Sequence, residues 1–583
     1  MKLRLLALAI LLLSLGYWFL SRDFDRVGST LYTNAEVLTM EPDGHHNAEA
    51  VFVQDGIIKA IGSQEELEVY KTQADQVIDL HGQVLLPGFI DPHTHPALVS
   101  FFRDMVDLSG FTHRTNQSIW DRLAEQVKAT PKGELILCKG LDPVLVEDLE
   151  TPSKQFLDSI APHHPVFIVS QSMHSYWANS LAFEGAGIDK NTPDPSTASY
   201  YERDSLGELT GFLAEEEALK PFQKAILELQ VDGGISSAIR TLEDYARQGN
   251  TSIVAMGIST PETRVVDFFK FLSSGRPGFI TNALSKLGVL PKRKPAVRHF
   301  IYVRYNHLHH LPSSVDNGDD HFKILGVKYW YDGAPYTGSM YLEDPYLESE
   351  FNHDKLHIGH NHRGEALLSV DDMADAIDKY ESRGWQIAVH SQGDQSTKEV
   401  MEAFDRVSDL DKDRRHRIEH CLMIQPESLS EMKRMGIQPS FHTNHLYYYG
   451  EALKKEILGD GRADQILPIK TADSLGLIYT MHSDAPMFPS EPLSLIQTAV
   501  TRQTTAADTI GQRHAISVID GLKAMTINAA WQIKMEDKLG SIKVGKYADF
   551  VVLDRNPLAT PAAELRDIKV LRTIVAGQDV YVR

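Results

Sequence analysis

The chain has 583 residues, of which 42% are hydrophobic and 23% charged, so it can form a large core, and a disordered or collagen-like protein is excluded. Its net charge of −21 makes nucleic acid an unsuitable partner, because such a surface repels phosphate backbones. Two cysteines, Cys138 and Cys421, are too few for a disulfide framework or a cysteine-built zinc site. The 25 histidines could instead supply nitrogen ligands to a metal.

The chain begins with a short basic and apolar segment. Lys2 and Arg4 precede an apolar run from Leu5 to Leu20, which is intermediate in length between a signal-peptide core and a spanning helix of about 20 residues. We expect residues 1–28 to be a signal peptide or a signal-anchor helix; the alternative is a buried helix of a cytosolic protein. The basic flank predicts an exported protein, anchored in a membrane by this segment or located in the periplasm or outside the cell.

Both ends of the remaining chain have β-strand character. Residues 50–62 contain two β-rich runs around Asp55-Gly56, a dipeptide typical of hairpin turns. Residues 548–554 resemble a strand, and residues 573–582 resemble a second hairpin. The two ends could therefore pair into one small sheet domain.

The middle of the chain alternates between apolar strand-like runs and helix-like segments. The strand-like runs are Glu134–Cys138, Pro165–Ser170, Thr251–Met256, Ile324–Trp330, Gln386–His390, Arg417–His420, Gln438–Phe441 and Leu477–His482. We expect helices at Ser369–Arg383 and Gln395–Val407. Alternation over about 400 residues predicts an α/β protein with a parallel sheet, open or closed.

Several strand-like runs end on residues that can bind a metal ion. A run before His93-x-His95 would place both imidazoles on the same side, because side chains alternate along a strand. Three later runs end on His390, on His420 and just before Asp484. Each residue alone is more often a satisfied core histidine or a helix-capping aspartate. Four such strand ends in sequence order are difficult to attribute to chance.

Lys328 lies in the apolar, aromatic run Gly326–Gly333. A buried lysine is costly unless it is paired or neutralised. Its side chain could extend to solvent from a half-buried strand. Alternatively, the amine could be carboxylated by carbon dioxide and bridge two metal ions.

These motifs together resemble the amidohydrolase superfamily, and more closely amidohydrolase family 3, which includes YtcJ-like proteins and N-substituted formamide deformylase. The segments that carry the resemblance are Leu86–His95, His174–Asn179, Thr210–Leu213, Gly326–Gly333, Ile418–His420, Ser483–Pro486 and Gly540–Asp554. The resemblance implies a (β/α)8 TIM-like barrel over residues 88–524, with inserted loops. It also implies a composite β-sandwich domain built from both chain ends, residues 29–87 and 525–583.

The resemblance further implies two divalent metal ions, with zinc as the default and manganese or iron as alternatives. The implied ligands are His93, His95, Lys328, His390, His420 and Asp484. Carboxylated Lys328 would bridge the two ions. Asp484 would also be the catalytic residue, first as general base toward the attacking hydroxide and then as general acid toward the leaving nitrogen.

The chain departs from the family pattern after Asp332-Gly333 and at His482, where many relatives carry glycine. Both changes make it unsafe to transfer a substrate from relatives. His174, His442 and His482 are candidate substrate-binding residues.

We therefore predict a metal-dependent hydrolase that cleaves a non-peptide carbon–nitrogen bond, such as that of an amide or formamide, in a small-molecule substrate. One alternative is a mononuclear deaminase acting on a ring C=N bond, and another is a non-catalytic binding protein on the same fold. Assembly into a homo-oligomer stays open.

Overall fold

The computed structural model describes residues 28–41, 48–196, 199–228, 234–258, 260, 262–275, 279–290 and 293–583. At its centre is an eight-stranded sheet in which all neighbouring strands are parallel. Its strands are β7 (Phe89–Thr94), β14 (Asn250–Ile258), β15 (Arg298–Arg304), β16 (Phe322–Trp330), β17 (Gln386–Ser391), β18 (Arg417–His420), β19 (Gln438–Phe441) and β20 (Thr480–Met481).

The last strand of this sheet returns to the side of the first. Just beyond β20, the N–H of Asp484 donates to the carbonyl of His93 over 3.0 Å, and the N–H of His95 donates to the carbonyl of Ala485 over 2.8 Å. The sheet is thus a nearly closed, TIM-like barrel, as the sequence predicted. Both faces of strands such as β14 and β17 are buried, and the central residues of these strands are mainly apolar.

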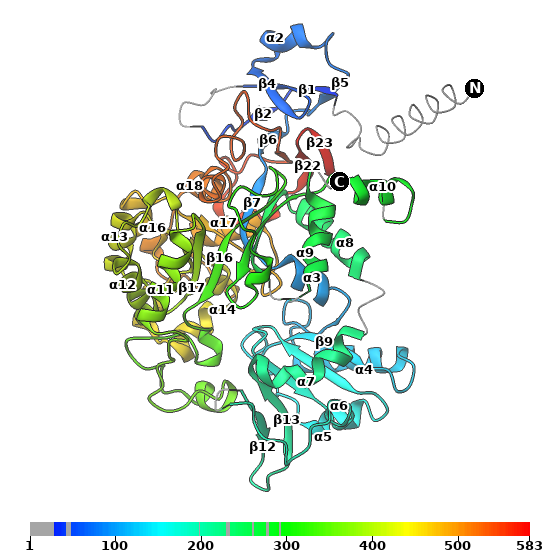
Figure 1. Ribbon diagram of the computed structural model, residues 1–583, viewed down its shortest axis with the longest axis vertical. Coiled ribbons are helices and arrows are strands. Elements are labelled where there is room, and N and C mark those ends of the chain that lie inside the picture. Colours follow the sequence, from blue (N-terminus) through cyan, green and yellow to red (C-terminus); the bar gives the residue numbers. More distant parts are fainter. Residues whose placement is uncertain are drawn as a thin grey trace, which may run out of the picture.

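Helices cover the outside of the barrel (Figure 1). They include α8 (Gly234–Arg247), α9 (Thr263–Ser273), α11 (Val370–Glu381), α12 (Asp394–Asp405), α13 (Pro426–Met435), α14 (Asn444–Ala452), α16 (Ile469–Ser474), α17 (Pro492–Thr501) and α18 (Val518–Ala524). Helix α11 begins where the Ser369 hydroxyl accepts the N–H of Asp372, and α13 ends at Gly436, whose φ of +76° favours glycine. The two helices predicted from sequence correspond to α11 and α12 within a few residues.

Two of the predicted strand runs do not belong to the barrel. They form β9 (Ile136–Leu141) and β10 (Val166–Ser170) of a separate six-stranded sheet. That sheet also contains β8 (Val106–Asp107), β11 (Ser175–Ala178), β12 (Tyr201–Arg203) and β13 (Leu209–Ala214), and α4 (Asn116–Ala129), α5 (Lys154–Ile160), α6 (Ser180–Ala186) and α7 (Glu215–Glu228) accompany it. Figure 1 shows this inserted sheet on one side of the barrel, opposite the sheets of the chain ends.

Strand β15 takes a place in the barrel that the sequence analysis did not assign. Its sequence is Arg-His-Phe-Ile-Tyr-Val-Arg, and the polar residues at both ends mask the short apolar run between them. Arg298 is nevertheless fully buried, because Asp549 neutralises it. Because β9 and β10 lie in the inserted sheet, the prediction that residues 134–170 continue the parallel sheet of the barrel was wrong in detail.

Strands from both chain ends pair with each other. Strand β6 (Val84–Pro87) runs antiparallel to β21 (Phe550–Leu553) in a five-stranded sheet that also holds β2 (Glu36–Val37), β22 (Val570–Val575) and β23 (Gln578–Val582). A four-stranded sheet contains β1 (Ser29–Thr33), β3 (Ala50–Gln54), β4 (Ile57–Gly62) and β5 (Gln76–Asp79). Tyr32, Val51, Leu85 and Phe550 share one apolar cluster, so the two sheets are packed together.

The predicted localisation has to be withdrawn. Within the part of the chain that the structure describes, no helix is both long enough and apolar enough to cross a bilayer. The apolar run from Leu5 to Leu20, on which the prediction of an exported, membrane-anchored protein rested, lies outside the described residues.

A buried ion pair fastens the C-terminal sheet to the barrel. Arg298 Nε lies 2.6 Å from Asp549 Oδ2, and Arg298 Nη2 lies 2.9 Å from Asp549 Oδ1. We expect Asp549→Ala to lower the free energy of unfolding by about 3–5 kcal/mol, because it leaves the Arg298 charge buried and unpaired. Asp579→Ala, which removes the partly exposed pair with Arg572, should cost less than about 1 kcal/mol. Equal thermal unfolding midpoints of the two variants would contradict this assignment.

Candidate metal centre

Three of the predicted ligands meet where β7 and β20 end. His93 Nε2 lies 3.2 Å from Asp484 Oδ1, and His95 Nε2 lies 3.0 Å from the same oxygen. Strand alternation places both imidazoles on one side, and the hydrogen bonds that join β20 to β7 bring Asp484 to them. Two imidazoles and a carboxylate around one point are a ligand set that zinc and related divalent metals accept.

His390 and His420 lie beside this group. Their ring centroids are 4.2 Å apart, and the His420 ring is 4.9 Å from that of His93. Alternation alone would turn His420 outward like Ile418, two residues earlier on β18. His420 has a φ of +73°, in the left-handed region that non-glycine residues rarely adopt. This local turn directs His420 toward the other imidazoles, and backbone strain of this kind is typical of functional sites.

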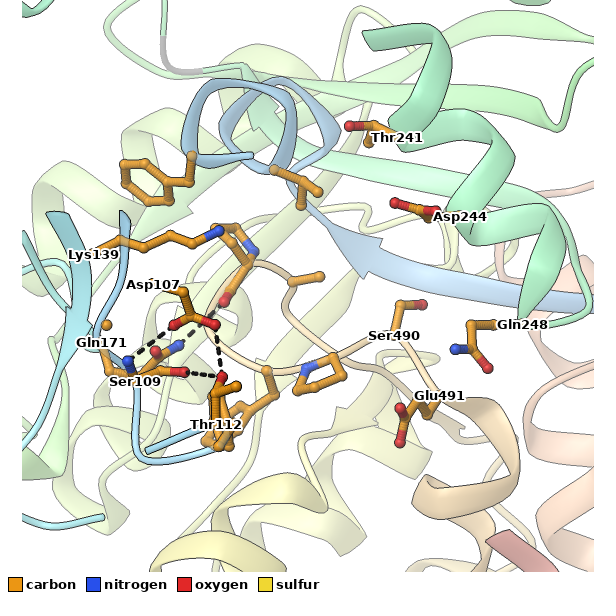
Figure 2. Close-up of a pocket in the computed structure, with 18 of the residues that line it drawn as sticks. Asp107, Ser109, Thr112, Lys139, Gln171, Thr241, Asp244, Gln248, Ser490 and Glu491 are labelled. Atoms are coloured by element: carbon orange, nitrogen blue, oxygen red, sulfur yellow. Dashed lines mark hydrogen bonds between the residues drawn. The ribbon is translucent and has the colours of Figure 1, made fainter. Parts of the chain in front are cut away.

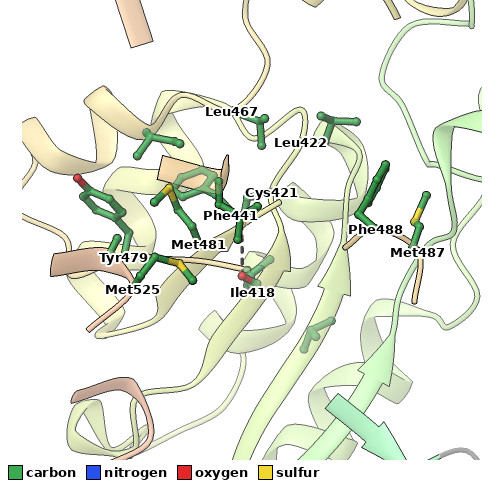
Figure 3. Close-up of a cluster of buried hydrophobic side chains, with 14 of the residues drawn as sticks. Ile418, Cys421, Leu422, Phe441, Leu467, Tyr479, Met481, Met487, Phe488 and Met525 are labelled. Carbon is green, nitrogen blue, oxygen red and sulfur yellow. Dashed lines mark hydrogen bonds between the residues drawn. The ribbon is translucent and has the colours of Figure 1, made fainter. Parts of the chain in front are cut away.

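The outward-facing side chains of the same strands hold the wall of the barrel in place. Figure 3 shows Ile418, Phe441 and Met481 among the apolar side chains of this cluster, with Cys421 close to Ile418. The Cys421 thiol donates to the Ile418 carbonyl over 3.3 Å, and burial raises its pKa. Cys421 is therefore a packing residue and not a nucleophile.

Lys328 is fully buried on β16, and its Nζ has no hydrogen-bond partner among the described residues. The Nζ lies 5.0 Å from the centroid of the Trp330 ring. Burial lowers the pKa of Lys328 to about 8, although Glu419 and Asp484 act in the opposite direction. The environment therefore makes the uncharged amine more accessible than it is for an exposed lysine, although the charged form still predominates at pH 7.

Glu419 is a functional candidate that sequence reasoning missed. Its Oε2 accepts a hydrogen bond from His93 Nδ1 over 2.8 Å, and Arg417 donates to both of its oxygens. Because a carboxylate can only accept, His93 carries its proton on Nδ1 and turns the lone pair of Nε2 toward Asp484. The available signal was the pair Arg417-x-Glu419 inside an apolar run, where two buried charges need each other.

Asp332 was also missed as a structural part of the centre. It is fully buried and accepts the backbone N–H groups of Gln392, Gly393 and Tyr341, which fixes the loop that follows His390. Burial raises its pKa to about 7. The carboxyl thereby sets the position of His390, whose Nε2 lies 3.7 Å away.

The three candidate substrate-binding histidines occupy different positions. His442 and His482 are fully buried among the imidazoles of the centre. His174 comes from the inserted sheet, keeps 37% of its side chain exposed and pairs with Glu215 over 3.0 Å. Burial lowers the pKa of His390 well below its usual range, and the charges of Lys328 and His174 lower it further.

A cavity of about 470 Å³ opens between α3 (Pro96–Phe102), α8, the inserted sheet and the loop after Asp484. Ala485 and Pro486, the two residues that follow Asp484, line it, whereas none of the predicted metal ligands does. Figure 2 shows Asp107 bound to Ser109 and Thr112 on one side of the cavity. Its size suits a small molecule, and it adjoins Asp484.

Comparisons with known proteins agree with this architecture. YtcJ of Bacillus subtilis (strain 168), which carries an amidohydrolase name, is 27% identical over 557 residues, covering 94% of this chain and 98% of YtcJ. N-substituted formamide deformylase of Arthrobacter pascens is 25% identical over 556 residues, covering 94% of this chain and 98% of that enzyme. A solved structure of an uncharacterized metal-dependent hydrolase from Pyrococcus horikoshii OT3 has a TM-score of 0.69 at 21% identity, covering 92% of this chain and 99% of that one, and shows the same fold.

The sequence model of the amidohydrolase family matches residues 76–581, which is most of the chain. This match confirms the predicted enzyme class, a hydrolase of carbon–nitrogen bonds, and a divalent metal accords with the imidazole and carboxylate groups at the barrel mouth. The chain belongs to the amidohydrolase family.

Proposed function

We propose that this protein hydrolyses the non-peptide carbon–nitrogen bond of a small amide or formamide, with Asp484 as general base and then general acid. Two observations carry the proposal: His93, His95 and Asp484 meet at one point, and the buried amine of Lys328 has no hydrogen-bond partner among the described residues. The similarity to N-substituted formamide deformylase over most of the chain supports an amide-type substrate.

The side chains present fit divalent metal ions. His93, His95 and Asp484 would hold one ion, and His390 and His420 a second. We propose zinc, with manganese or iron as alternatives. When bound, the ions would lower the pKa of a coordinated water toward 7 and polarise the substrate carbonyl.

We propose Lys328 as a carboxylated bridging ligand. With a pKa of about 8, roughly one tenth of the amine is neutral at pH 7, far more than for an ordinary lysine. The neutral amine can form an N–C bond to carbon dioxide and release a proton, which gives a carbamate. The negative charge of the carbamate would be compensated by the ions, and the Nζ would gain a partner that the described residues do not provide.

We propose Asp484 as the proton-transfer residue. Its side chain is 13% exposed and contacts His95, and the next two residues, Ala485 and Pro486, line the cavity. The carboxylate can take a proton from the attacking water and deliver it to the leaving nitrogen. His174, at the edge of the centre, is the proposed substrate contact from the inserted sheet.

We also propose the domain division: residues 88–524 as the barrel with its insertions, and residues 29–87 with 525–583 as a composite β-sandwich. The pairing of β6 with β21 and the shared apolar cluster support this division.

Substitution of Lys328 tests the bridging role. We expect wild-type protein to bind about two metal ions per chain, and Lys328→Ala to lose metal and more than about 100-fold in amide hydrolysis, because a bridging ligand is gone. Lys323→Ala, on the same strand but partly exposed, is the control.

Metal quantification is paired with a screen of amides, formamides, N-acyl amino acids and ring amidines. Full metal content and activity in Lys328→Ala would show that the lysine is not a ligand, and one ion with ammonia release from a ring substrate would favour the deaminase.

Glu419 should control the metal affinity of His93. We expect Glu419→Gln to weaken metal binding by about 10–100-fold, because it removes the carboxylate that orients the imidazole. Since this change also leaves Arg417 buried and unpaired, the double variant Arg417→Met/Glu419→Gln serves to restore stability. Its metal affinity, measured by competition with a chelator, should stay low. Wild-type affinity in both variants would contradict the positioning role.

A further inference from the structure

No hydrogen bond to the described residues explains the burial of the His482 ring. It is fully buried directly after β20, and neither of its ring nitrogens has a hydrogen-bond partner among the described residues. A neutral imidazole carries one donor and one acceptor, and leaving either of them buried and unsatisfied is unfavourable. We therefore expect the ring nitrogens of His482 to bind a group that is not among the described protein groups.

The neighbours of His482 are other imidazoles. Its ring is stacked on that of His93 at 4.3 Å between centroids, and it lies 5.1 Å from His420 and 4.8 Å from His442. His420, His442 and His482 can each offer one nitrogen such that the three nitrogens lie within 4.8 Å of one another. Small rotations of the side chains would bring all three onto one ion.

The hydrogen bond of His442 fixes which of its nitrogens is available. His442 Nε2 lies 3.1 Å from the carbonyl oxygen of Ser483, which can only accept, so Nε2 carries the proton. The lone pair of His442 is therefore on Nδ1, which faces His420 Nδ1 at 3.4 Å. Two nitrogens bound to one tetrahedral zinc ion at 2.0–2.1 Å would lie about 3.3–3.4 Å apart. The observed separation matches that of two ligands on one ion.

We propose that His442 and His482, together with His420, form a three-imidazole site for a divalent metal ion such as Zn²⁺. Three imidazoles leave the fourth position of a tetrahedral ion open, as in hydrolytic zinc sites. The inference rests on the proposed function, because His420 is shared with the position assigned there to the second ion. It changes His442 and His482 from candidate substrate contacts into metal ligands.

The test is zinc titration of full-length protein after removal of metal with a chelator. We expect His482→Gln and His442→Gln each to lose one equivalent of zinc, or to bind it at least about 10-fold more weakly, and the double variant to lose no more than either single one. The matched control is His445→Gln. His445 is equally buried and 4.2 Å from the His442 ring, but its Nδ1 is bound to the Tyr336 hydroxyl and it is outside the three-nitrogen group. It should bind zinc like wild type.

The outcomes separate this inference from the proposed function. Wild-type zinc stoichiometry and affinity in the His482 and His442 variants would overturn the three-imidazole site and leave an ordered water as the partner of His482. A wild-type chain that binds no zinc, manganese or iron would contradict the proposed function itself. Circular dichroism identifies a variant that does not fold. If one of the two single variants does not fold, the zinc titration of the other one tests the three-imidazole site.

Discussion

Two backbone hydrogen bonds join the end of β20 to the end of β7, and the metal centre depends on them. They connect Asp484 with His93 and His95 with Ala485. His95 and Asp484 are 389 residues apart in the sequence, yet their side chains are 3.0 Å apart. The barrel therefore closes where three of the proposed ligands, His93, His95 and Asp484, come together.

The closed barrel also explains why so many imidazoles can be kept together. His93, His390, His420, His442 and His482 all have pKa values well below the usual range, primarily because they are buried. Uncharged rings do not repel each other as cations would, and their lone pairs stay available to a metal ion. Glu419 forms a hydrogen bond with one of these rings, whereas the ring nitrogens of His482 have no hydrogen-bond partner within the described part of the chain. The surplus of histidines in the sequence is thus partly concentrated at one end of the barrel.

Much of this arrangement could be predicted from the sequence. Apolar runs that end on His93, His390 and His420 indicated strands whose carboxyl ends face a common mouth, because strand alternation and barrel geometry are regular. The strand β15 could not be predicted in the same way. It begins with Arg298, a charged residue that is buried only because it pairs with Asp549, and the sequence does not reveal this pair. Strands β9 and β10 looked like barrel strands because local periodicity does not say which sheet a strand joins.

Other features depended on contacts between distant segments. The left-handed turn at His420 directs its side chain against the strand alternation, and no residue type in the sequence signals it. The role of Glu419 required knowing that His93 lies opposite, on the first strand of the barrel. Full burial of His442 and His482 likewise follows only from the packing of β18, β19 and β20.

Anomalous X-ray diffraction of crystals grown with the native metal, recorded across its absorption edge, would locate the bound ions. We expect a strong anomalous peak between His93, His95 and Asp484, where the first and last barrel strands meet. A metal-containing protein without a peak at this mouth, or with an ion only at the exposed group of Glu348, His353 and His360, would contradict it.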